Sequence, residues 1–235
     1  MQDEESKIEK LRKRREQIAM RIDAALQLRK RTRESVRIVA VTKYVGADAV
    51  RTLSDIGITD FGENRWQVAK PKVTSLPSAT WHFIGPLQRN KVRMIVPHFT
   101  WIHSVDRGEL ADEISREAMT HGVHPKILLQ VNVSGEPQKS GVSQDRVLSL
   151  LTYCAKLPHV EVAGLMSIGR QVIVPEDARA DFQTLAALRN DLERQTGIVL
   201  PELSMGMSND FDIAVEEGAT IVRIGRYLVN FEQEL

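Results

Sequence analysis

The chain has few of the residues that build disulfides, metal sites or low-complexity segments. Its single cysteine, Cys154, can form no internal disulfide and supplies no Cys-x-x-Cys zinc motif. This usage is typical of a reducing compartment. The 14 glycines and nine prolines among 235 residues exclude a collagen-like chain. What remains is the composition of an ordinary globular protein, with 42% hydrophobic and 27% charged residues.

Charge and hydropathy also lack a strong bias. The 32 basic and 31 acidic side chains leave a net charge of +1, which gives no general reason to expect nucleic acid or an anionic membrane as a partner. No apolar run approaches the roughly 18 residues of a membrane span. The N-terminal segment is charged rather than apolar, so no secretory signal is predicted. We therefore expect a cytoplasmic protein.

Common catalytic and metal-binding motifs are missing too. The sequence contains no HExxH, Walker or Gly-x-Ser-x-Gly motif. Four histidines stand apart from any metal-ligand spacing: His82, His103, His121 and His124. We expect no metal site.

The segment from Glu4 to Arg33 predicts one long helix. Its apolar residues recur at spacings of three, four and seven: Ile8, Leu11, Ile18, Ile22, Ala25 and Leu26. The other faces carry Arg, Lys and Glu, which favours a solvated outer face with ion pairs four residues apart. RNA or anionic lipid is the alternative partner for such a basic helix.

The remaining sequence alternates short apolar runs with helical segments. Residues 36–42 are rich in β-branched side chains, as a buried strand is. By the same criterion we predict strands near residues 36–43, 60–64, 80–85, 100–106, 126–133, 160–168, 202–208 and 220–225. Helical segments between them include residues 47–56, 108–120, 144–157, 175–195 and 210–217.

Eight strands that alternate with helices predict an α/β fold of parallel strands. The best match is a single closed (β/α)8 barrel (TIM barrel) with an extra N-terminal helix. An open, doubly wound sheet is the alternative, but it needs a Gly-rich fingerprint after its first strand, and Val41–Gly46 is not GxGxxG. Because there is no repeat or Ser/Gly linker, we expect one domain over residues 1–235, with the helical segment 1–34 packed on the barrel.

Polar residues gather at the predicted C-terminal ends of the strands, where barrel enzymes hold their chemistry. Lys43 ends the first strand, and a lysine rarely ends a buried strand that faces a core. In a barrel mouth it can lose its proton through desolvation and form an imine with a carbonyl compound. Alternatively, it points to solvent or pairs with Glu63.

The segment Ser204–Asp210 indicates an anion site. Ser208 or Asn209 is predicted to cap the helix that follows, and a helix N-terminus offers free N–H groups. After the eighth strand, the N–H groups of Gly225 and Arg226 can point at the same anion, and barrels often bind phosphate there. An ordinary capped turn is the alternative. An imine-forming lysine beside a phosphate cradle points to pyridoxal 5′-phosphate (PLP).

Arg223 lies two residues before Gly225, so both face the same side of the strand. From there it can reach a pyridine nitrogen. Because arginine has no acceptor, it would keep that nitrogen unprotonated and weaken the ring as an electron sink. The alternative is an ion pair with a neighbouring acid.

Motifs along nearly the whole chain carry a family resemblance. They are Ala40–Lys43, Phe61–Asn64, His82–Gln88 with Asn90-Lys91, His103–Asp106, Gln130–Asn132, Gly164–Ser167, Ser204–Ser208 and Val222–Gly225. In this order they resemble the pyridoxal phosphate homeostasis protein family (YggS/PROSC). The resemblance implies a single barrel similar to the N-terminal domain of alanine racemase, with PLP covalently held on Lys43 as an internal aldimine.

The resemblance also implies the remaining cofactor contacts. Phosphate contacts are expected from Ser208, Gly225 and Arg226, and Arg223 is expected near the pyridine nitrogen. Asn64 and Ser204 are expected to line the pocket, and Met166 and Ser167 are expected under the ring. The family usually has a small hydroxyl residue where Arg226 stands, so the backbone N–H and the guanidinium are expected to replace that hydroxyl contact.

The family is regarded as a non-catalytic carrier that takes part in intracellular PLP homeostasis and in amino-acid and keto-acid balance. We expect a monomer whose partners are PLP and PLP-dependent apo-enzymes, with no nucleic acid or membrane. A small PLP-dependent racemase or lyase is the alternative, but a racemase needs two opposed bases. Lys43 would be one of these bases, and Tyr227 is the open candidate for the second. A cofactor-free aldolase is a third hypothesis.

Overall fold

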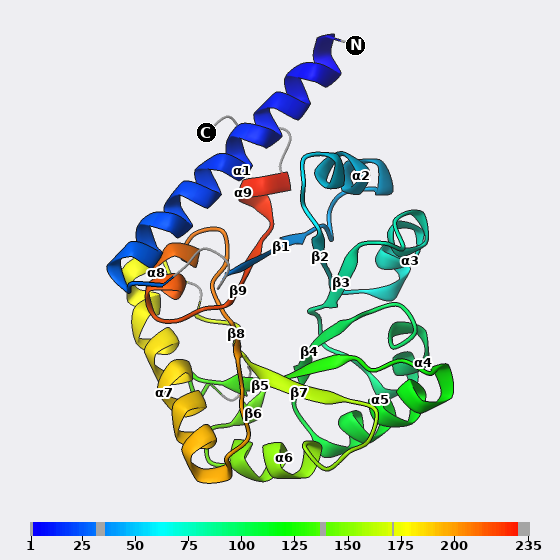
Figure 1. Ribbon diagram of the computed structural model, residues 1–235, viewed down its shortest axis with the longest axis vertical. Coiled ribbons are helices and arrows are strands. Elements are labelled where there is room, and N and C mark those ends of the chain that lie inside the picture. Colours follow the sequence, from blue (N-terminus) through cyan, green and yellow to red (C-terminus); the bar gives the residue numbers. More distant parts are fainter. Residues whose placement is uncertain (1, 32–35, 137–139, 171, 230–235) are drawn as a thin grey trace.

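The computed structural model describes residues 2–31, 36–136, 140–170 and 172–229. Eight parallel strands close into a barrel inside a ring of helices (Figure 1). In barrel order they are β1 (Arg37–Val41), β2 (Asp60–Glu63), β3 (Thr80–Phe83), β4 (Trp101–Val105), β5 (Lys126–Asn132), β7 (Glu161–Met166), β8 (Glu202–Ser204) and β9 (Ile221–Ile224). Pairing of β9 with β1 and of β4 with β5 closes the ring. The predicted barrel is confirmed, and all eight predicted strands are present.

The helices connect successive strands on the outside of the barrel. They are α1 (Gln2–Leu28), α2 (Ala47–Asp55), α3 (Trp66–Ser75), α4 (Val92–Ile95), α5 (Gly108–His121), α6 (Val147–Cys154), α7 (Arg179–Thr196), α8 (Phe211–Glu216) and α9 (Arg226–Val229). Two 3₁₀ turns, η2 (Arg89–Lys91) and η3 (Pro175–Ala178), lead into α4 and α7, and the two-residue strand β6 (Val142–Ser143) pairs with β5. None of the described helices is long and apolar enough to cross a membrane.

Three helices were not predicted from the sequence: α3, α4 and the four-residue α9. Helix α3 contains Pro71, which usually ends a helix, and α4 is only four residues long. Helices α3 and α4 are held by tertiary packing of a few buried residues rather than by a long apolar stripe: Ala69, Val73, Val92 and Ile95.

Alternation along the strands divides the core into two layers. Residues that point outward pack beneath the helices, as Ala40 and Phe61 do. Residues that point inward form a separate apolar cluster inside the barrel: Val39, Trp101, Leu128, Ala163, Met166 and Ile221. Because Val39 points inward, the residues at steps of two along β1 do so as well.

A buried ion pair lies in the outer layer between β2 and α3. Lys72 Nζ contacts Glu63 Oε1 at 2.5 Å, and both side chains are buried. The same ammonium donates to the Thr42 carbonyl at 2.6 Å, and Thr42 Oγ1 donates to Glu63 Oε1 at 2.6 Å. The pair therefore holds the end of β1 just before Lys43.

We predict that Lys72→Met lowers the free energy of unfolding by about 3–5 kcal/mol, because it leaves the Glu63 carboxylate buried without its cation. Urea unfolding measures the effect. Lys70→Met, on the exposed face of the same helix, is the matched control and should stay within about 0.5 kcal/mol of the wild type. Equal losses for the two variants would contradict the role assigned to the pair.

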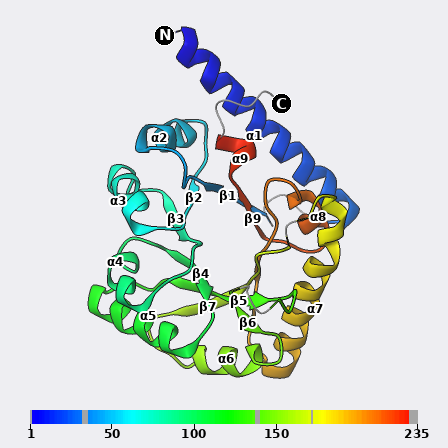
Figure 2. The same ribbon diagram turned by 180° about the vertical axis from the view of Figure 1, so that it is seen from behind.

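Helix α1 lies diagonally across α8 and α9, and both views show its first turns extending past the barrel (Figures 1 and 2). Arg21 of this helix pairs with Asp212 of α8 at 2.7 Å, and Arg29, just after the helix, pairs with Glu217, just after α8, at 2.8 Å. Basic residues of this helix and of the turn after it thus bond across to the barrel.

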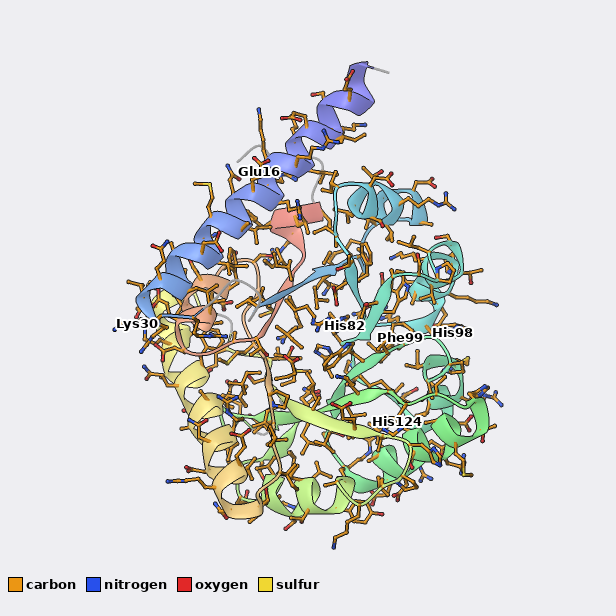
Figure 3. All side chains as sticks on the ribbon, viewed as in Figure 1. Glu16, Lys30, His82, His98, Phe99 and His124 are labelled. Carbon is orange, nitrogen blue, oxygen red and sulfur yellow. The ribbon has the colours of Figure 1, made fainter. Side chains whose placement is uncertain are left out.

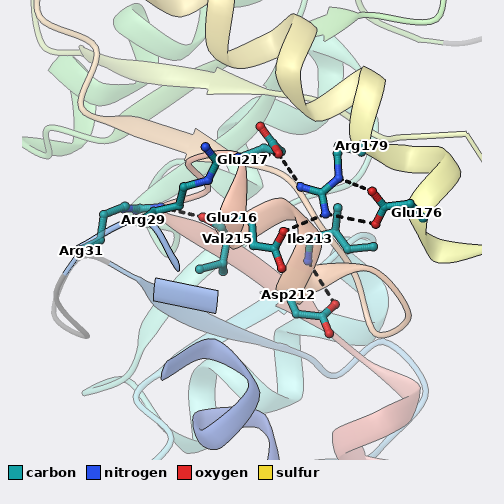
Figure 4. A network of polar contacts seen from close by, with 9 residues as sticks. All are labelled: Arg29, Arg31, Glu176, Arg179, Asp212, Ile213, Val215, Glu216 and Glu217. Carbon is teal, nitrogen blue, oxygen red and sulfur yellow. Dashed lines mark hydrogen bonds and ion pairs between the residues drawn. The ribbon is translucent and has the colours of Figure 1, made fainter. Parts of the chain in front are cut away.

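The residues that follow α1 and the start of α7 meet at α8 in one polar network (Figure 4). Arg31, which lies after α1, donates to the Val215 carbonyl in the last turn of α8 and to the Ala219 carbonyl beyond that helix. Arg179 of α7 contacts Glu216 and Glu217 at 2.7 and 2.5 Å. Two long helices are therefore anchored to the short segment between β8 and β9, which steadies that segment.

Candidate functional site at the barrel mouth

Lys43 lies at the C-terminal mouth of the barrel. The Thr42 N–H donates to the Gly62 carbonyl at 3.0 Å, so the β1–β2 ladder runs one residue past β1. Lys43 follows Val39 and Val41 at steps of two and therefore faces inward. It is half-buried, and its Nζ lies 4.9 Å from the centre of the Tyr44 ring.

The carboxylate that might have neutralised Lys43 is engaged elsewhere. Glu63 points outward to Lys72, so the alternative of a Lys43–Glu63 pair is wrong. The physical reason is alternation, because Lys43 and Glu63 lie on opposite faces of the barrel wall. Within the described part of the chain the Lys43 ammonium has no carboxylate partner, which leaves it available to a ligand.

Arg223 lies in β9 at the level of Val39, two inward-facing positions below Lys43. The register pairs Arg223 with Val39, so the guanidinium points into the barrel. It is almost fully buried; its Nη1 donates to Ser204 Oγ at 2.7 Å and its Nη2 to the Ser167 carbonyl at 2.9 Å. Burial lowers its pKa to about 10, so it is still a cation at neutral pH. Its direct hydrogen-bond partners are thus neutral oxygens, rather than the neighbouring acid of the alternative interpretation.

Ser208 and the start of α9 form a small cradle of donors. The N–H groups of Gly225 and Tyr227 converge on Ser208 Oγ, at 3.3 and 3.5 Å. Gly206 gives the loop its shape, because its φ of +88° and a site for Cβ only 2.5 Å from Ala214 Cβ admit no side chain. Arg226, exposed, opens α9 beside the cradle.

The predicted helix cap in this loop is wrong. Helix α8 begins at Phe211 and its N-cap is Asp210, not Ser208 or Asn209. The Asp210 carboxylate accepts the Met207 N–H at 2.6 Å, which closes a turn before the helix starts. Ser208 is thereby left facing the start of α9 instead of α8.

The other predicted pocket residues lie on neighbouring strand ends. Ser204 ends β8 and is fully buried, and Met166 belongs to the apolar cluster inside the barrel. Ser167 follows β7, and its buried Oγ has no hydrogen-bond partner among the described residues. Asn64 follows β2 and packs so tightly on Gly85 that a Cβ there would lie 2.4 Å from the Asn64 carbonyl.

Sequence reasoning missed a polar chain that leads to Arg223 through Ser204. His82 of β3 and His103 of β4 both point inward and are fully buried, and they bond to each other at 2.9 Å. Figure 3 shows His82 inside the ring of strands, whereas His98 lies in the outer layer. Asp60 joins His82 on one side and Ser204 joins His103 on the other, both at 3.0 Å. Strand periodicity offers one signal for this chain. Asp60 lies two residues before Gly62, which faces inward, so Asp60 faces inward as well.

Burial sets the charge of these groups. Desolvation lowers the pKa of His82 despite its bond to Asp60, and it lowers that of His103 further because His82 and Arg223 add positive charge nearby. Burial would raise the pKa of Asp60, but hydrogen bonds from His82, Thr59 and Arg37 outweigh it and hold that pKa at about 2. The histidines are therefore neutral and Asp60 is ionised at neutral pH.

We predict that the free energy of unfolding falls as the pH drops below about 6.5, because the unfolded chain then protonates His82 and His103 while the folded chain does not. Their stabilisation is complete above the unfolded pKa, and the slope is at most about 1.4 kcal/mol per pH unit for each histidine. Urea unfolding at about pH 7.5 and about pH 5.5 measures it. The control variant His124→Gln, at an exposed site, should keep the full slope. A flat profile would contradict the neutral assignment.

A separate surface hollow of about 680 Å³ lies between α5 and α6. Its lining includes Asp106, Arg146 and Tyr153. None of the nine predicted cofactor residues borders it, so it is distinct from the barrel mouth.

The barrel and its mouth define a protein of the alanine racemase N-terminal-domain class. The family described as "Alanine racemase, N-terminal domain" matches residues 21–232 of this chain. The match includes all eight strands and every predicted site residue.

Two relatives carry the name "Pyridoxal phosphate homeostasis protein". That of Pseudomonas aeruginosa is 42% identical over 214 residues, covering 90% of this chain and 91% of its own, and that of Aquifex aeolicus is 41% identical over 210 residues, covering 88% and 92%. The solved structure of PipY from Synechococcus elongatus with PLP bound has 39% identity and a TM-score of 0.78, covering 90% of this chain and 99% of its own. The chain therefore belongs to the pyridoxal phosphate homeostasis protein family.

Proposed function

We propose that this protein binds PLP at the barrel mouth and takes part in PLP homeostasis. The observation that carries the proposal is that Lys43, the Ser208–Gly225 donor cradle and Arg223 open on the same end of one barrel. An amine, an anion cradle and a cation suit the aldehyde, the phosphate and the ring nitrogen of PLP. The PLP-bound structure of PipY, at 39% identity, supports the same ligand.

Two features of the mouth fit a ligand of this kind. Gly225 does not need to be glycine for its backbone conformation, and a Cβ there would meet Val41 at an ordinary 3.5 Å. Close approach of a bound group is the remaining reason for a glycine at this position. The buried Ser167 Oγ lacks a protein partner within the described residues and so offers a hydrogen bond to a ligand.

The nine residues take the following roles in the proposal. Lys43 Nζ is the covalent attachment point. Ser208, the Gly225 N–H and Arg226 hold the phosphate, and Arg223 donates to the ring nitrogen. The pocket is lined by Asn64, Ser204, Met166 and Ser167. Bound PLP supplies an electron-withdrawing ring for amino-acid chemistry, and a cationic donor at its nitrogen limits that ring as an electron sink.

We infer a carrier or regulator rather than an enzyme. Tyr227, the candidate for a second base, donates its hydroxyl to Gln17 Oε1 on α1 at 3.2 Å. That contact lies on the outer side of the barrel, which supports a site with Lys43 as its single base. The proposal comprises one domain, residues 1–235, acting as a cytoplasmic monomer that hands PLP to apo-enzymes. The buried thiol of Cys154, whose pKa burial raises to about 12, suits a reducing compartment.

We predict that borohydride reduction of the PLP-loaded protein places a pyridoxyl group on Lys43 and that Lys43→Ala abolishes both the adduct and the yellow colour. Peptide mass mapping and the visible spectrum measure this. Lys70→Ala, an exposed lysine of α3, is the control and should keep both. An adduct on another lysine would overturn the assignment, and a wild-type protein that binds no PLP would overturn the function.

We predict that Gly225→Ala weakens PLP binding about tenfold or more, while the free energy of unfolding changes by less than about 1 kcal/mol. The added methyl occupies ligand space without meeting protein. Gly206→Ala is the contrasting variant, because its positive φ and its clash with Ala214 should cost about 1–3 kcal/mol of stability. Fluorescence titration with PLP and urea unfolding separate the two effects. Unchanged PLP affinity in Gly225→Ala would contradict the cradle.

A further inference from the structure

A continuous chain of hydrogen bonds crosses the barrel interior from β2 to β9. Asp60 Oδ1 contacts His82 Nε2 at 3.0 Å, His82 Nδ1 contacts His103 Nε2 at 2.9 Å, and His103 Nδ1 contacts Ser204 Oγ at 3.0 Å. Ser204 Oγ accepts from Arg223 Nη1 at 2.7 Å. All five side chains are buried. We call these residues the interior relay.

The two ends of the relay determine the direction of every bond between them. Arg223 carries only donors, and the ionised Asp60 only accepts. His82 must therefore carry its proton on Nε2, which leaves Nδ1 as an acceptor. His103 then needs its proton on Nε2 to donate to His82, so its own Nδ1 accepts from the Ser204 hydroxyl. Every proton thus points from Arg223 toward Asp60.

The relay has a cost that apolar residues would avoid. Apolar side chains form a cluster in the barrel interior beside the relay, as Leu128, Ala163 and Ile221 illustrate. Two neutral imidazoles and a hydroxyl in such a place are tolerated only when each polar atom has a partner. The relay meets that condition and ends on the residue assigned to the ring nitrogen, while Trp101 stacks on His82 with an angle of 5° between the rings.

We propose that Asp60, His82 and His103 are positioning residues that act through Ser204 to hold the Arg223 guanidinium in one orientation, so that it presents a fixed donor to the ring nitrogen of bound PLP and keeps that nitrogen unprotonated. The inference rests on the proposed function, because it takes Arg223 to face the ring. It adds that the electronic state of the cofactor is set by groups at the far end of the relay, on β2, β3 and β4.

The groups around the relay are consistent with this direction. Arg37 of β1 donates to Asp60 Oδ1 at 2.9 Å, and Thr59 donates to Asp60 Oδ2 at 2.7 Å. Asp60 therefore receives donors from three sides and remains an acceptor. Glu202 of β8 adds negative charge near His82, whereas Arg37 adds positive charge near both histidines.

The first experiment needs no substitution in the relay. Long-range ¹H–¹⁵N correlation spectra of the full chain at neutral pH report which ring nitrogen of each histidine is protonated. We expect His82 and His103 both to be neutral with the proton on Nε2. A proton on His103 Nδ1 would mean that His82 is charged and the chain is reversed at its middle, which would overturn the proposed direction.

The second experiment follows the ring nitrogen of PLP labelled with ¹⁵N. Ser204→Ala removes the hydroxyl that anchors the guanidinium, and His103→Phe removes the group that orients this hydroxyl. In both variants we expect the pH at which the ring nitrogen takes up a proton to rise by about one unit or more. His103→Gln can still donate to His82 and accept from Ser204, so it should restore most of the wild-type behaviour. His124→Phe is the matched control at an exposed histidine.

The outcomes separate the relay from the proposed function. A normal Lys43 adduct together with an unchanged ring-nitrogen titration in Ser204→Ala would overturn the relay and leave PLP binding standing. A wild-type protein without PLP would overturn the proposed function, and the histidine spectra would still decide the direction of the relay. A titration that shifts equally in His124→Phe would overturn the positioning role.

Discussion

The buried guanidinium of Arg223 is the constraint on which the interior of this barrel depends. Taking a cation out of water costs several kcal/mol unless donors and acceptors are placed around it. The barrel meets this cost with the Ser204 hydroxyl, the Ser167 carbonyl and a line of neutral imidazoles that ends on an ionised carboxylate. The interior consequently carries a line of polar groups beside an apolar cluster.

Strand β2 links this interior to the outer layer. Its four residues are all buried and carry one acid toward each face of the wall: Asp60 faces inward to the relay and Glu63 outward to Lys72. The inner acid terminates the chain from Arg223, and the outer one, through Lys72, holds the backbone just before Lys43. Arg223 and Lys43 are thus supported from opposite faces of the same short strand.

The segment between β8 and β9 is stabilised from outside by ion pairs rather than by its own length. Helix α8 has six residues, yet Arg21 of α1 and Arg179 of α7 both pair with it, and Arg29, just after α1, pairs with the residue that follows it. Because Ser208 and Gly225 lie on either side of α8, the geometry of the donor cradle depends on these helix contacts. The basic residues of α1 therefore have a structural role in the site.

Much of this protein followed from its sequence. Alternating β-branched runs and helical segments determined the barrel, and the position of Lys43, Arg223 and Gly225 at strand ends determined which residues share a face, because the period of a strand is two. Only the tertiary structure decided the partners: Lys72 rather than Lys43 for Glu63, Asp210 rather than Ser208 as the cap, and the joining of Asp60, His82, His103 and Ser204. Asp60, His82, His103 and Ser204 lie on four different strands, and the bonded pair His103 and Ser204 is 101 positions apart. Local periodicity says which way a side chain points, but only closure of the barrel brings distant strands within hydrogen-bond distance.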